Sequence, residues 1–324
     1  MTESEPAPPT AESNQDGIPV ILATDIGSDV DDTWALAQLL RTPELDLRLV
    51  ITETGEANYR AQVAAKLLER AGRCDVQIGL GVDFGSMQDH ERHQGPWVEN
   101  YALDSYPGDV HDDGIEACVN QINESSEPVT IISIAPTPSL AAVIKRAPAV
   151  AEQCRFVGMH GSFYAGYGGV GEPDAETNVR VAPDALRTVF AADWQDIVIT
   201  PLDTCGSVVL DGSHYRAIWS ATDDVLARSV IENTCIFAPR VSWMDYEDFA
   251  LRSSTLFDSV AVYLAHDESW VKTEAMTFTI TDDGYTVPSD DGEFTARVAL
   301  AWRDRDAFES YLRDVLLDRS SLGM

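Results

Sequence analysis

The architecture of this chain can be read outward from one stretch near its start, Ile21-Leu22-Ala23-Thr24-Asp25-Ile26-Gly27-Ser28-Asp29-Val30-Asp31-Asp32. A strand-like apolar run comes first, four aspartates follow within eight residues, and a helical pattern begins near Thr33. Open α/β sheets bind ligands beyond the carboxyl ends of their strands, which is where this acidic loop falls. Two carboxylates ~4 Å apart repel by roughly 4 kcal/mol at an effective dielectric constant of about 20. If the fold gathers these side chains, either their pKa values rise or a cation binds among them.

Short strand-like runs alternate with helical patterns after this stretch. Strands are expected at residues 18–23, 45–52, 76–79, 129–135, 155–159 and 196–200. Helices are expected between them at residues 33–41, 58–71, 113–123, 139–146 and 183–192. This spacing predicts an α/β fold with an open, mostly parallel sheet and helices on both faces.

The two ends of the chain have different patterns. Residues 1–17 are rich in Pro, Glu, Ser and Thr, which predicts a disordered acidic tail. From about residue 212 the pattern changes to consecutive C-terminal helices, then to a short antiparallel hairpin within residues 272–300, and finally to a helix over residues 304–317. With no linker visible after residue 17, residues 18–324 are predicted to form a single domain.

Composition limits the classes of function. The chain has 54 acidic and 22 basic residues, a formal net charge of −32, which disfavours binding to nucleic acid. Only three basic residues are lysines, a composition that resembles proteins of halophilic microbes. No apolar run approaches the ~20 residues of a membrane span, and the five scattered cysteines indicate reduced thiols. We therefore expect a soluble cytoplasmic protein that does not bind membranes.

Two further segments place polar groups at the ends of strands. The run Ile131–Leu140 leads from a strand into a helix start marked by Pro and Ser. The run Met159–Phe163 opens a glycine-rich loop that leads to Glu176 and Asn178. Because these two residues alternate, both would point to one side if the segment is extended.

The acidic loop can be set beside two known acidic motifs, the EF-hand loop and the phosphatase nucleophile motif. An EF-hand needs alternating acidic positions, then Gly and a Glu at the twelfth position, and this run does not supply them. Asp29-Val30-Asp31-Asp32-Thr33 reads as the nucleophile motif of haloacid-dehalogenase-type phosphatases. In that family, however, the first Asp follows its strand directly, whereas Asp29 lies several residues beyond Thr24. The phosphatase remains the less favoured alternative.

In their order along the chain, these segments resemble the inosine/uridine-preferring nucleoside hydrolase family over nearly all of residues 18–320. The opening motif of that family is a strand, Asp-Pro-Gly, one residue, and Asp-Asp-Ala before a helix. Here Asp25-Ile26-Gly27 and Asp31-Asp32-Thr33 resemble its two halves. The longer spacer Ser28-Asp29-Val30 is a departure that we associate with a divergent branch of the family.

Three later motifs continue the resemblance. The family's Gly-Pro-Leu-Thr-Asn turn is similar to Ala135–Ser139, and its Glu-Phe-Asn motif is similar to Glu176-Thr177-Asn178. Its late His-Asp-Pro helix start is similar to Phe257-Asp258-Ser259.

The resemblance implies a calcium-dependent N-glycosyl hydrolase that converts a ribonucleoside or related ribosyl compound to ribose and a free base. The implied Ca²⁺ ligands are Asp25, Asp32, the carbonyl of Ile134 and Asp258, a set of oxygens that suits this ion. Asp25 would also act as the general base. The implied contacts of the sugar hydroxyls come from Asp31, Glu176 and Asn178, and they would favour an oxocarbenium-like transition state.

The leaving base is the part of the reaction that the resemblance leaves open. Phe257 stands where family members that cleave inosine and uridine have a histidine that protonates the base, and phenylalanine cannot donate a proton. The aromatic residues Trp243, Tyr246 and Tyr167 are candidates for stacking on the base, and His160 is a candidate proton donor. The sequence does not decide the base preference, or whether Asp29 or Asp31 contacts the sugar.

Two hypotheses of different class remain on this scaffold. The first is the nucleoside hydrolase just described, with a small-molecule nucleoside as its partner and a homodimer or homotetramer as its assembly. The alternative is a non-catalytic or repurposed sugar- or nucleoside-binding protein, which Phe257 and the altered opening loop suggest.

Overall fold

The computed structural model describes residues 17–319, apart from residues 86, 88–90 and 245 and the side chains of Tyr246 and Glu247. The predicted tail, residues 1–17, lies outside the described residues except for Gly17.

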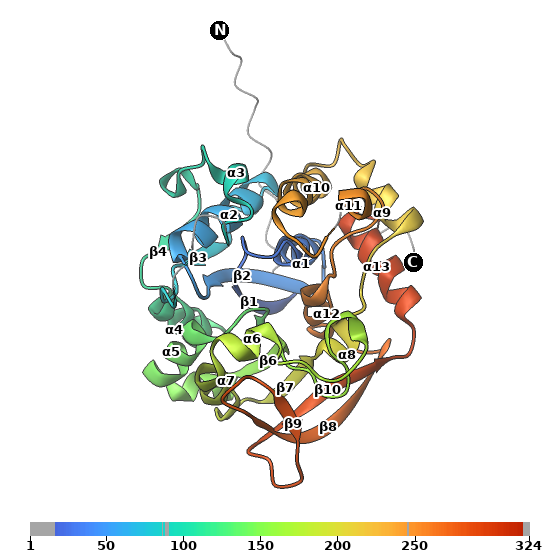
Figure 1. Ribbon diagram of the computed structural model, residues 1–324. Coiled ribbons are helices and arrows are strands. Elements are labelled where there is room, and N and C mark those ends of the chain that lie inside the picture. Colours follow the sequence, from blue (N-terminus) through green and yellow to red (C-terminus); the bar gives the residue numbers. More distant parts are fainter. Residues whose placement is uncertain (1–16, 86, 88–90, 245, 320–324) are drawn as a thin grey trace.

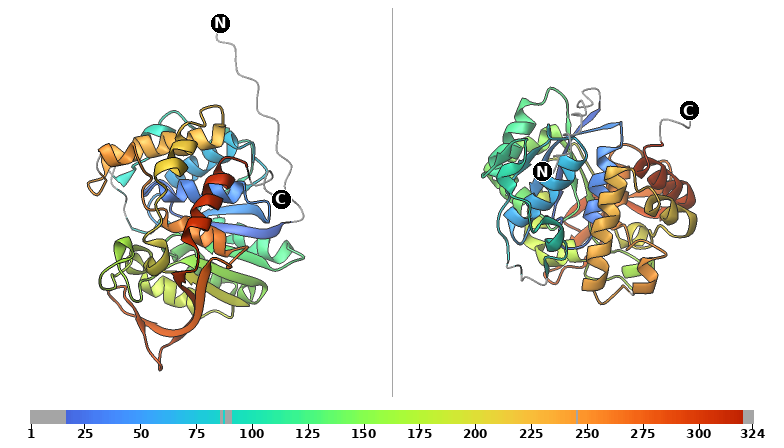
Figure 2. Two further views of the ribbon diagram at one scale, coloured as in Figure 1. Left: turned by 90° about the vertical axis from the view of Figure 1, so that its right-hand side faces the viewer. Right: turned by 90° about the horizontal axis from the view of Figure 1, so that it is seen from above.

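One mixed sheet of ten strands forms the centre of the molecule, in the order β4-β3-β2-β1-β5-β6-β7-β10-β8-β9 (Figure 1). Its strands are β1 Ile18–Thr24, β2 Leu45–Thr52, β3 Gln77–Gly79, β4 Val110–His111, β5 Val129–Ser133, β6 Cys154–Met159, β7 Asp196–Thr200, β8 Val271–Ile280, β9 Thr286–Pro288 and β10 Phe294–Trp302. The pairs from β4 across to β10 are parallel, whereas β10–β8 and β8–β9 are antiparallel. The antiparallel part extends from the body of the molecule as a ribbon (Figure 2).

Helices cover both faces of this sheet (Figure 1). They are α1 Asp31–Leu40, α2 Ala57–Arg70, α3 Gly95–Val98, α4 Gly114–Glu124, α5 Pro138–Arg146, α6 Thr177–Val181, α7 Pro183–Phe190, α8 Leu202–Cys205, α9 Gly212–Trp219, α10 Val225–Phe237, α11 Tyr246–Phe249, α12 Phe257–Leu264 and α13 Arg305–Leu316. Short 3₁₀ turns add η2 Leu103–Ser105, η3 Pro148–Gln153, η4 Tyr167–Gly169 and η5 Ala238–Arg240.

The alternation of side chains along β1 divides the interior into two cores. Val20 and Leu22 face the core shared with α1, α2, α10, α12 and α13, whereas Ile21 and Ala23 face the core of α4, α5 and α7. Because both faces are covered, β1 is apolar at nearly every position rather than at alternate ones. The predicted α/β class, the open and mostly parallel sheet, the C-terminal helices and the hairpin are confirmed.

The boundaries differ from the prediction where the loops begin. Helix α1 starts at Asp31 rather than Thr33, so Asp31 and Asp32 lie in its first turn, where the helix dipole favours negative charge. Strand β5 ends at Ser133 rather than Ala135, and the N–H of Ile134 still donates to the carbonyl of Ala23 at 2.9 Å. Strand β4 was not predicted, because two residues carry no readable alternation.

The order of the strands determines where a ligand can bind. Strand β1 lies between β2 and β5, and the order of connection reverses at this point, which opens a crevice beyond the carboxyl ends of β1 and β5. Helix α12 packs against α1, β5 and β6, so its first turn also lies near the crevice.

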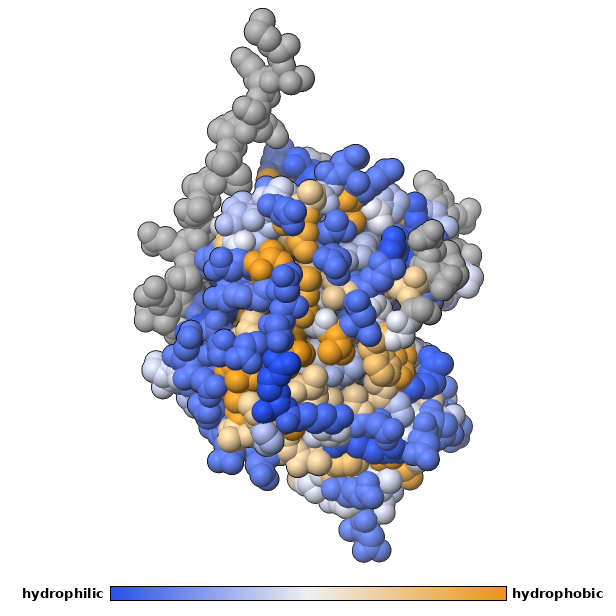
Figure 3. Space-filling model, turned by 90° about the vertical axis from the view of Figure 1, so that its left-hand side faces the viewer, coloured by the Kyte–Doolittle hydropathy of each residue, from blue (hydrophilic) through white to orange (hydrophobic). Residues whose placement is uncertain are grey.

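The outer surface shown in Figure 3 is largely hydrophilic, with apolar strips between the polar side chains. Among the described residues, no helix combines the length and the apolar character that crossing a membrane requires.

Candidate functional site

A cavity of about 160 Å³ lies beyond the carboxyl ends of β1 and β5. It is lined by Asp25, Ser28, Asp29, Asp31, Asp32, Ile134, Met159, Tyr167, Glu176, Thr177, Asn178, Phe257 and Asp258. Pockets for drug-sized ligands measure about 300–1,000 Å³, so this smaller cavity has room for a sugar-sized polar group. Eight of the predicted site residues lie in this lining, from Asp25 near the start of the chain to Asp258 near its end.

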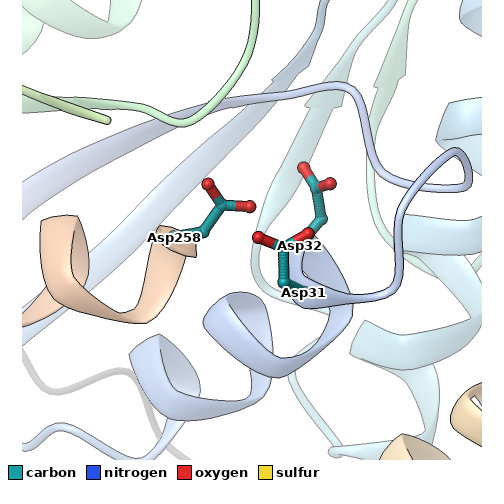
Figure 4. A group of neighbouring side chains, drawn as sticks. All are labelled: Asp31, Asp32 and Asp258. Carbon is teal, nitrogen blue, oxygen red and sulfur yellow. The ribbon is translucent and has the colours of Figure 1, made fainter. Parts of the chain in front are cut away.

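Three buried carboxylates converge at one side of the cavity. Carboxylate oxygens of Asp31, Asp32 and Asp258 all lie within 4.8 Å of one another. Figure 4 shows the carboxylate of Asp258, in the first turn of α12, directed toward those of Asp31 and Asp32 in the first turn of α1. The packing of α12 on α1 thus brings together groups that are far apart in sequence.

Asp32 is held in place by the end of β1. The hydroxyl of Thr24 donates a hydrogen bond to Oδ1 of Asp32, and the same hydroxyl oxygen accepts from the N–H of Ile26 at 3.0 Å. Thr24 is fully buried, so this contact fixes the orientation of Asp32 without competition from water.

The other two aspartates of the loop lie outside this three-carboxylate group. Asp25 lines the cavity, but its Oδ2 lies 3.7 Å from Nη2 of Arg60, with which it forms an ion pair. Asp29 also lines the cavity, and its Oδ1 accepts from the N–H of Val30 at 2.6 Å.

The electrostatics of the cavity favour a cation. Burial, and then the neighbouring carboxylates, raise the pKa values of Asp31, Asp32 and Asp258 well above the ordinary range. Burial also raises the pKa of Asp25, against the charge of Arg60, and raises the pKa of Asp29 to about 6. A bound cation would pair with the ionised carboxylates and so offset both the burial and the mutual repulsion that raise these pKa values.

The residues present fit a metal ion. Three buried carboxylates offer oxygen ligands at mutual distances that one ion can span, and the described cavity wall includes no cysteine or histidine. Oxygen-only sites select hard cations such as Ca²⁺ or Mg²⁺. The cluster is therefore able to hold a hard metal ion.

Glu176 and Asn178 also line the cavity. The segment is not extended as the alternation suggested, because Glu176 is the N-cap of helix α6 and Asn178 lies in its first turn. The carboxylate of Glu176 accepts from the N–H groups of Asn178, Gly161 and Val179 at 2.7, 3.1 and 3.2 Å. Burial nevertheless raises the pKa of Glu176 to about 7.

An aromatic pair, Tyr167 and Phe257, lines part of the cavity. The rings of Tyr167 and Phe257 meet edge to face, with centroids 6.0 Å apart and an interplanar angle of 88°. The Tyr167 hydroxyl lies 2.8 Å from Oγ1 of Thr177 and accepts from the Thr177 N–H at 3.1 Å, so the ring is tied to the start of α6.

Two predicted contacts, His160 and Trp243, are not in the described cavity lining. His160 is fully buried, stacks on Phe156 and places Nε2 3.2 Å from Oγ of Ser133. Burial lowers the pKa of His160 to about 3, which favours the neutral ring over the protonated form that a proton donor needs. Trp243 is 65% exposed and packs edge-on against Phe237 outside the lining. Tyr246 begins α11, but its side chain is outside the described residues.

Other residues of the site were not predicted from the sequence. Ser28, Met159 and Thr177 line the cavity, but they carry no distinctive chemistry and give no sequence signal. Arg60 did leave a signal, because it falls in register with Ala64 and Leu67 on the apolar face of α2. An arginine on such a face indicates a buried charge that needs partners.

The sequence profile described as inosine-uridine preferring nucleoside hydrolase matches residues 20–310. Among curated proteins, the non-specific ribonucleoside hydrolase RihC of Klebsiella pneumoniae is 28% identical over 208 residues. That match covers 62% of this chain and 66% of RihC, just under two thirds of the relative's length.

Solved structures share the fold. The plant nucleoside hydrolase PpNRh1 superposes with a TM-score of 0.77 at 20% identity, over 92% of this chain and 98% of that one. The inosine-uridine preferring nucleoside hydrolase of Bacillus anthracis gives a TM-score of 0.74 at 18% identity, over 92% of this chain and 99% of that one.

Proposed function

Because the chain belongs to the inosine-uridine preferring nucleoside hydrolase family, we propose that it hydrolyses the N-glycosidic bond of a ribonucleoside or related ribosyl compound. Membership of this family supports the predicted class, N-glycosyl hydrolase, over the phosphatase alternative. The observation that carries the proposal is the convergence of Asp25, Asp32, Asp258 and Ile134 on one cavity of sugar-sized volume. The products would be ribose and a free base.

We propose Ca²⁺ as the metal ion, with Asp25, Asp32, the carbonyl of Ile134 and Asp258 as its protein ligands. All four residues line the cavity, and oxygen ligands from separate loops suit the flexible coordination of this ion. Asp31 belongs to the same group of close carboxylates, so it is both the proposed sugar contact and a further candidate ligand. Bound Ca²⁺ would supply a Lewis acid that orients sugar hydroxyls and makes water a better nucleophile.

The chain's own residues would carry the remaining steps. Asp25 accepts a proton from the attacking water, a role that its place in the lining permits. Asp31, Glu176 and Asn178 would hydrogen-bond the sugar hydroxyls. The Nδ2 group of Asn178 donates to the carbonyl of Met159 at 3.0 Å, which fixes the orientation of the amide in the wall. These contacts favour the oxocarbenium-like transition state at the anomeric carbon.

The base would lie against aromatic side chains rather than beside a histidine. Tyr167 and Phe257 line the cavity and present a ring pair on which a heterocycle can pack. Trp243 and Tyr246 remain proposals for the outer part of this surface, where Trp243 is 65% exposed. We propose that the base departs without a proton from His160, whose ring is fully buried.

The second candidate function, binding of a sugar or nucleoside without catalysis, is favoured by Phe257 and by the altered opening loop. The test is to incubate the protein in molar KCl with Ca²⁺ and a panel of nucleosides and to assay the release of reducing sugar. Sugar release that disappears in EDTA supports the hydrolase. Binding of ribose without release of base from any compound would favour the binding protein.

The cellular setting remains a proposal. The five cysteines are free thiols, which suits a reducing cytoplasm. The net charge of −32 suits a high-salt cytoplasm and disfavours nucleic acid as a partner. We propose a homodimer or homotetramer as the assembly.

A further inference from the structure

Arg60 lies beneath the turn that follows β1, and its guanidinium bonds to three residues of that turn. It donates to the carbonyls of Asp25 and Ile26, the second at 3.1 Å, and to the hydroxyl of Ser28 at 3.1 Å. Its Nε donates to the carbonyl of Thr54 at 2.6 Å, which ties the turn to the end of β2. Its Nη2 lies 3.7 Å from Oδ2 of Asp25.

Burial makes these contacts energetically significant. Arg60 is only 2% exposed, and an arginine without partners in such a place would cost several kcal/mol. The planar guanidinium donates hydrogen bonds from Nε, Nη1 and Nη2 at the same time. The compact ammonium of a lysine cannot reproduce this arrangement of donors.

Tyr59, which precedes Arg60 on α2, contacts the same turn. The hydroxyl of Tyr59 donates to the carbonyl of Gly27 at 3.0 Å. Gly27 has φ of +111°, and a Cβ there would lie 2.7 Å from the Tyr59 ring, so the turn closes tightly on helix α2. Two residues in the first turns of α2, Tyr59 and Arg60, thus hold the turn that begins the acidic loop.

Arg60 does not itself line the cavity, but two of the residues that it holds, Asp25 and Ser28, do. We propose that Arg60 is a positioning residue, whose guanidinium holds the Asp25–Ser28 turn in the shape that the metal ion and the sugar require. This inference rests on the proposed calcium site, and it adds that Ca²⁺ binding there requires Arg60.

The direction of the effect on metal affinity separates positioning from simple charge. By charge alone, replacing Arg60 with a neutral residue would strengthen cation binding, because like charges repel. If Arg60 positions the ligands, its loss weakens binding, by roughly 10- to 100-fold as for other residues that orient metal ligands. Arg60→Met and Arg60→Lys should both show this loss, because neither keeps the planar fork.

The experiment is calorimetric titration of full-length protein with Ca²⁺ in the absence of substrate, for the wild type, Arg60→Met, Arg60→Lys and the control Arg70→Met. Arg70 is on the same helix and pairs with Glu232 at 2.7 Å, away from the cavity, so its variant should bind as the wild type does. Unchanged or tighter binding in the Arg60 variants, with Arg70→Met unchanged, would overturn the proposal.

Two further measurements keep the result interpretable. In EDTA, the amides of residues 26–30 should exchange hydrogen faster in Arg60→Met than in Arg70→Met, and equal exchange would contradict the proposed restraint. Methylguanidinium at millimolar concentration should restore part of the Ca²⁺ affinity of Arg60→Ala, and no recovery would argue against a specific role of the guanidinium. If the wild type itself binds no Ca²⁺, the proposed function fails at its metal site, whereas the exchange measurement still tests Arg60.

Discussion

At the residue scale, three carboxylates repel one another when they are ionised and no cation is bound. They belong to Asp31, Asp32 and Asp258, and their buried oxygens lie within 4.8 Å of one another. Asp258→Asn removes one of these charges and keeps the shape of the side chain. We expect this variant to unfold at a higher temperature than the wild type in EDTA. It should also lose much of the stabilisation by Ca²⁺, which for a binding site is about 2.7 kcal/mol at 100 times Kd.

Thermal unfolding in EDTA and in millimolar CaCl₂ measures both effects on the same pair of proteins. The two changes in unfolding temperature should have opposite signs, higher in EDTA and lower in CaCl₂ relative to the wild type. A variant that is simply destabilised would unfold at a lower temperature in both conditions. A normal calcium shift in Asp258→Asn would remove Asp258 from the ligand set.

Asp25→Asn tests the proposed base. Removal of a general base typically costs about 10²–10⁴-fold in rate, so kcat should fall by this factor. The fold should persist, because Arg60 donates to the backbone carbonyl of Asp25, which the substitution leaves in place. The assay is release of reducing sugar, with Asp184→Asn as a control whose carboxylate is 93% exposed on α7. An active Asp25→Asn enzyme would exclude the role.

His160 should make the protein less stable in acid. Its pKa is lowered to about 3 in the fold by burial, whereas an unfolded histidine titrates near its ordinary value of about 6.5. Below that value the unfolded chain binds a proton that the folded chain does not, so this contribution to stability falls as pH decreases from about 6.5 to about 3.

His160→Phe, which keeps the aromatic packing against Phe156, should therefore lose less stability than the wild type between pH 7 and pH 5. Urea unfolding in EDTA at several pH values measures the two slopes, which should differ by up to one proton per molecule. Parallel slopes would show that His160 is not buried as a neutral ring.

At the scale of elements, Glu53 joins the end of β2 to the start of α5. Its buried carboxylate accepts from the N–H groups of Ser139 and Leu140 at 2.6 and 3.0 Å. This contact anchors the loop that also contains Ile134. We expect Glu53→Ala to lower the free energy of unfolding by about 1–3 kcal/mol, since it leaves two buried donors unpaired.

Urea unfolding of Glu53→Ala beside Glu127→Ala, a substitution in the exposed turn before β5, provides the measurement and its control. Ca²⁺ affinity should fall as well, because the Ile134 loop loses its anchor. Normal stability in Glu53→Ala would show that this contact contributes little.

The element boundaries show what the sequence could predict and what it could not. The pattern of apolar runs located β1, β2 and β7 closely, because buried strands of a parallel sheet are nearly continuous in apolar residues. It did not predict that Glu176 would cap a helix, because Thr177–Val181 is too short to show a helical period. Arg60 shows in the sequence as a charge on an apolar helix face, but the pattern does not reveal which groups it contacts, because several of them are backbone carbonyls.

For the molecule as a whole, the charge of −32 should make stability depend on salt. Repulsion among surface carboxylates is screened over about 10 Å in 0.1 M salt and about 3 Å in 1 M salt. We therefore expect the unfolding temperature to rise between 0.1 M and 2 M KCl. Thermal unfolding at constant pH in EDTA measures it, and a flat or falling curve would contradict the proposed adaptation to high salt.

At this scale the sequence was a good guide to the α/β class, the open sheet and the antiparallel hairpin. The order of the strands was not predictable from local pattern, because it depends on which pairs form across the whole chain. That Asp258 lies near Asp32 was predicted from the family resemblance and not from local pattern, since only the packing of α12 on α1 brings these residues together.

The position of β10 has a consequence for synthesis on the ribosome. Strand β10 lies between β7 and β8, although β8 is translated first. A nascent chain can pair β1 to β7 as they emerge, but the edge of β7 must then wait for residues 294–302 before the sheet can grow further. Until translation reaches them, β7 and β8 each present an unpaired edge, the kind of surface on which chaperones act and through which nascent chains aggregate.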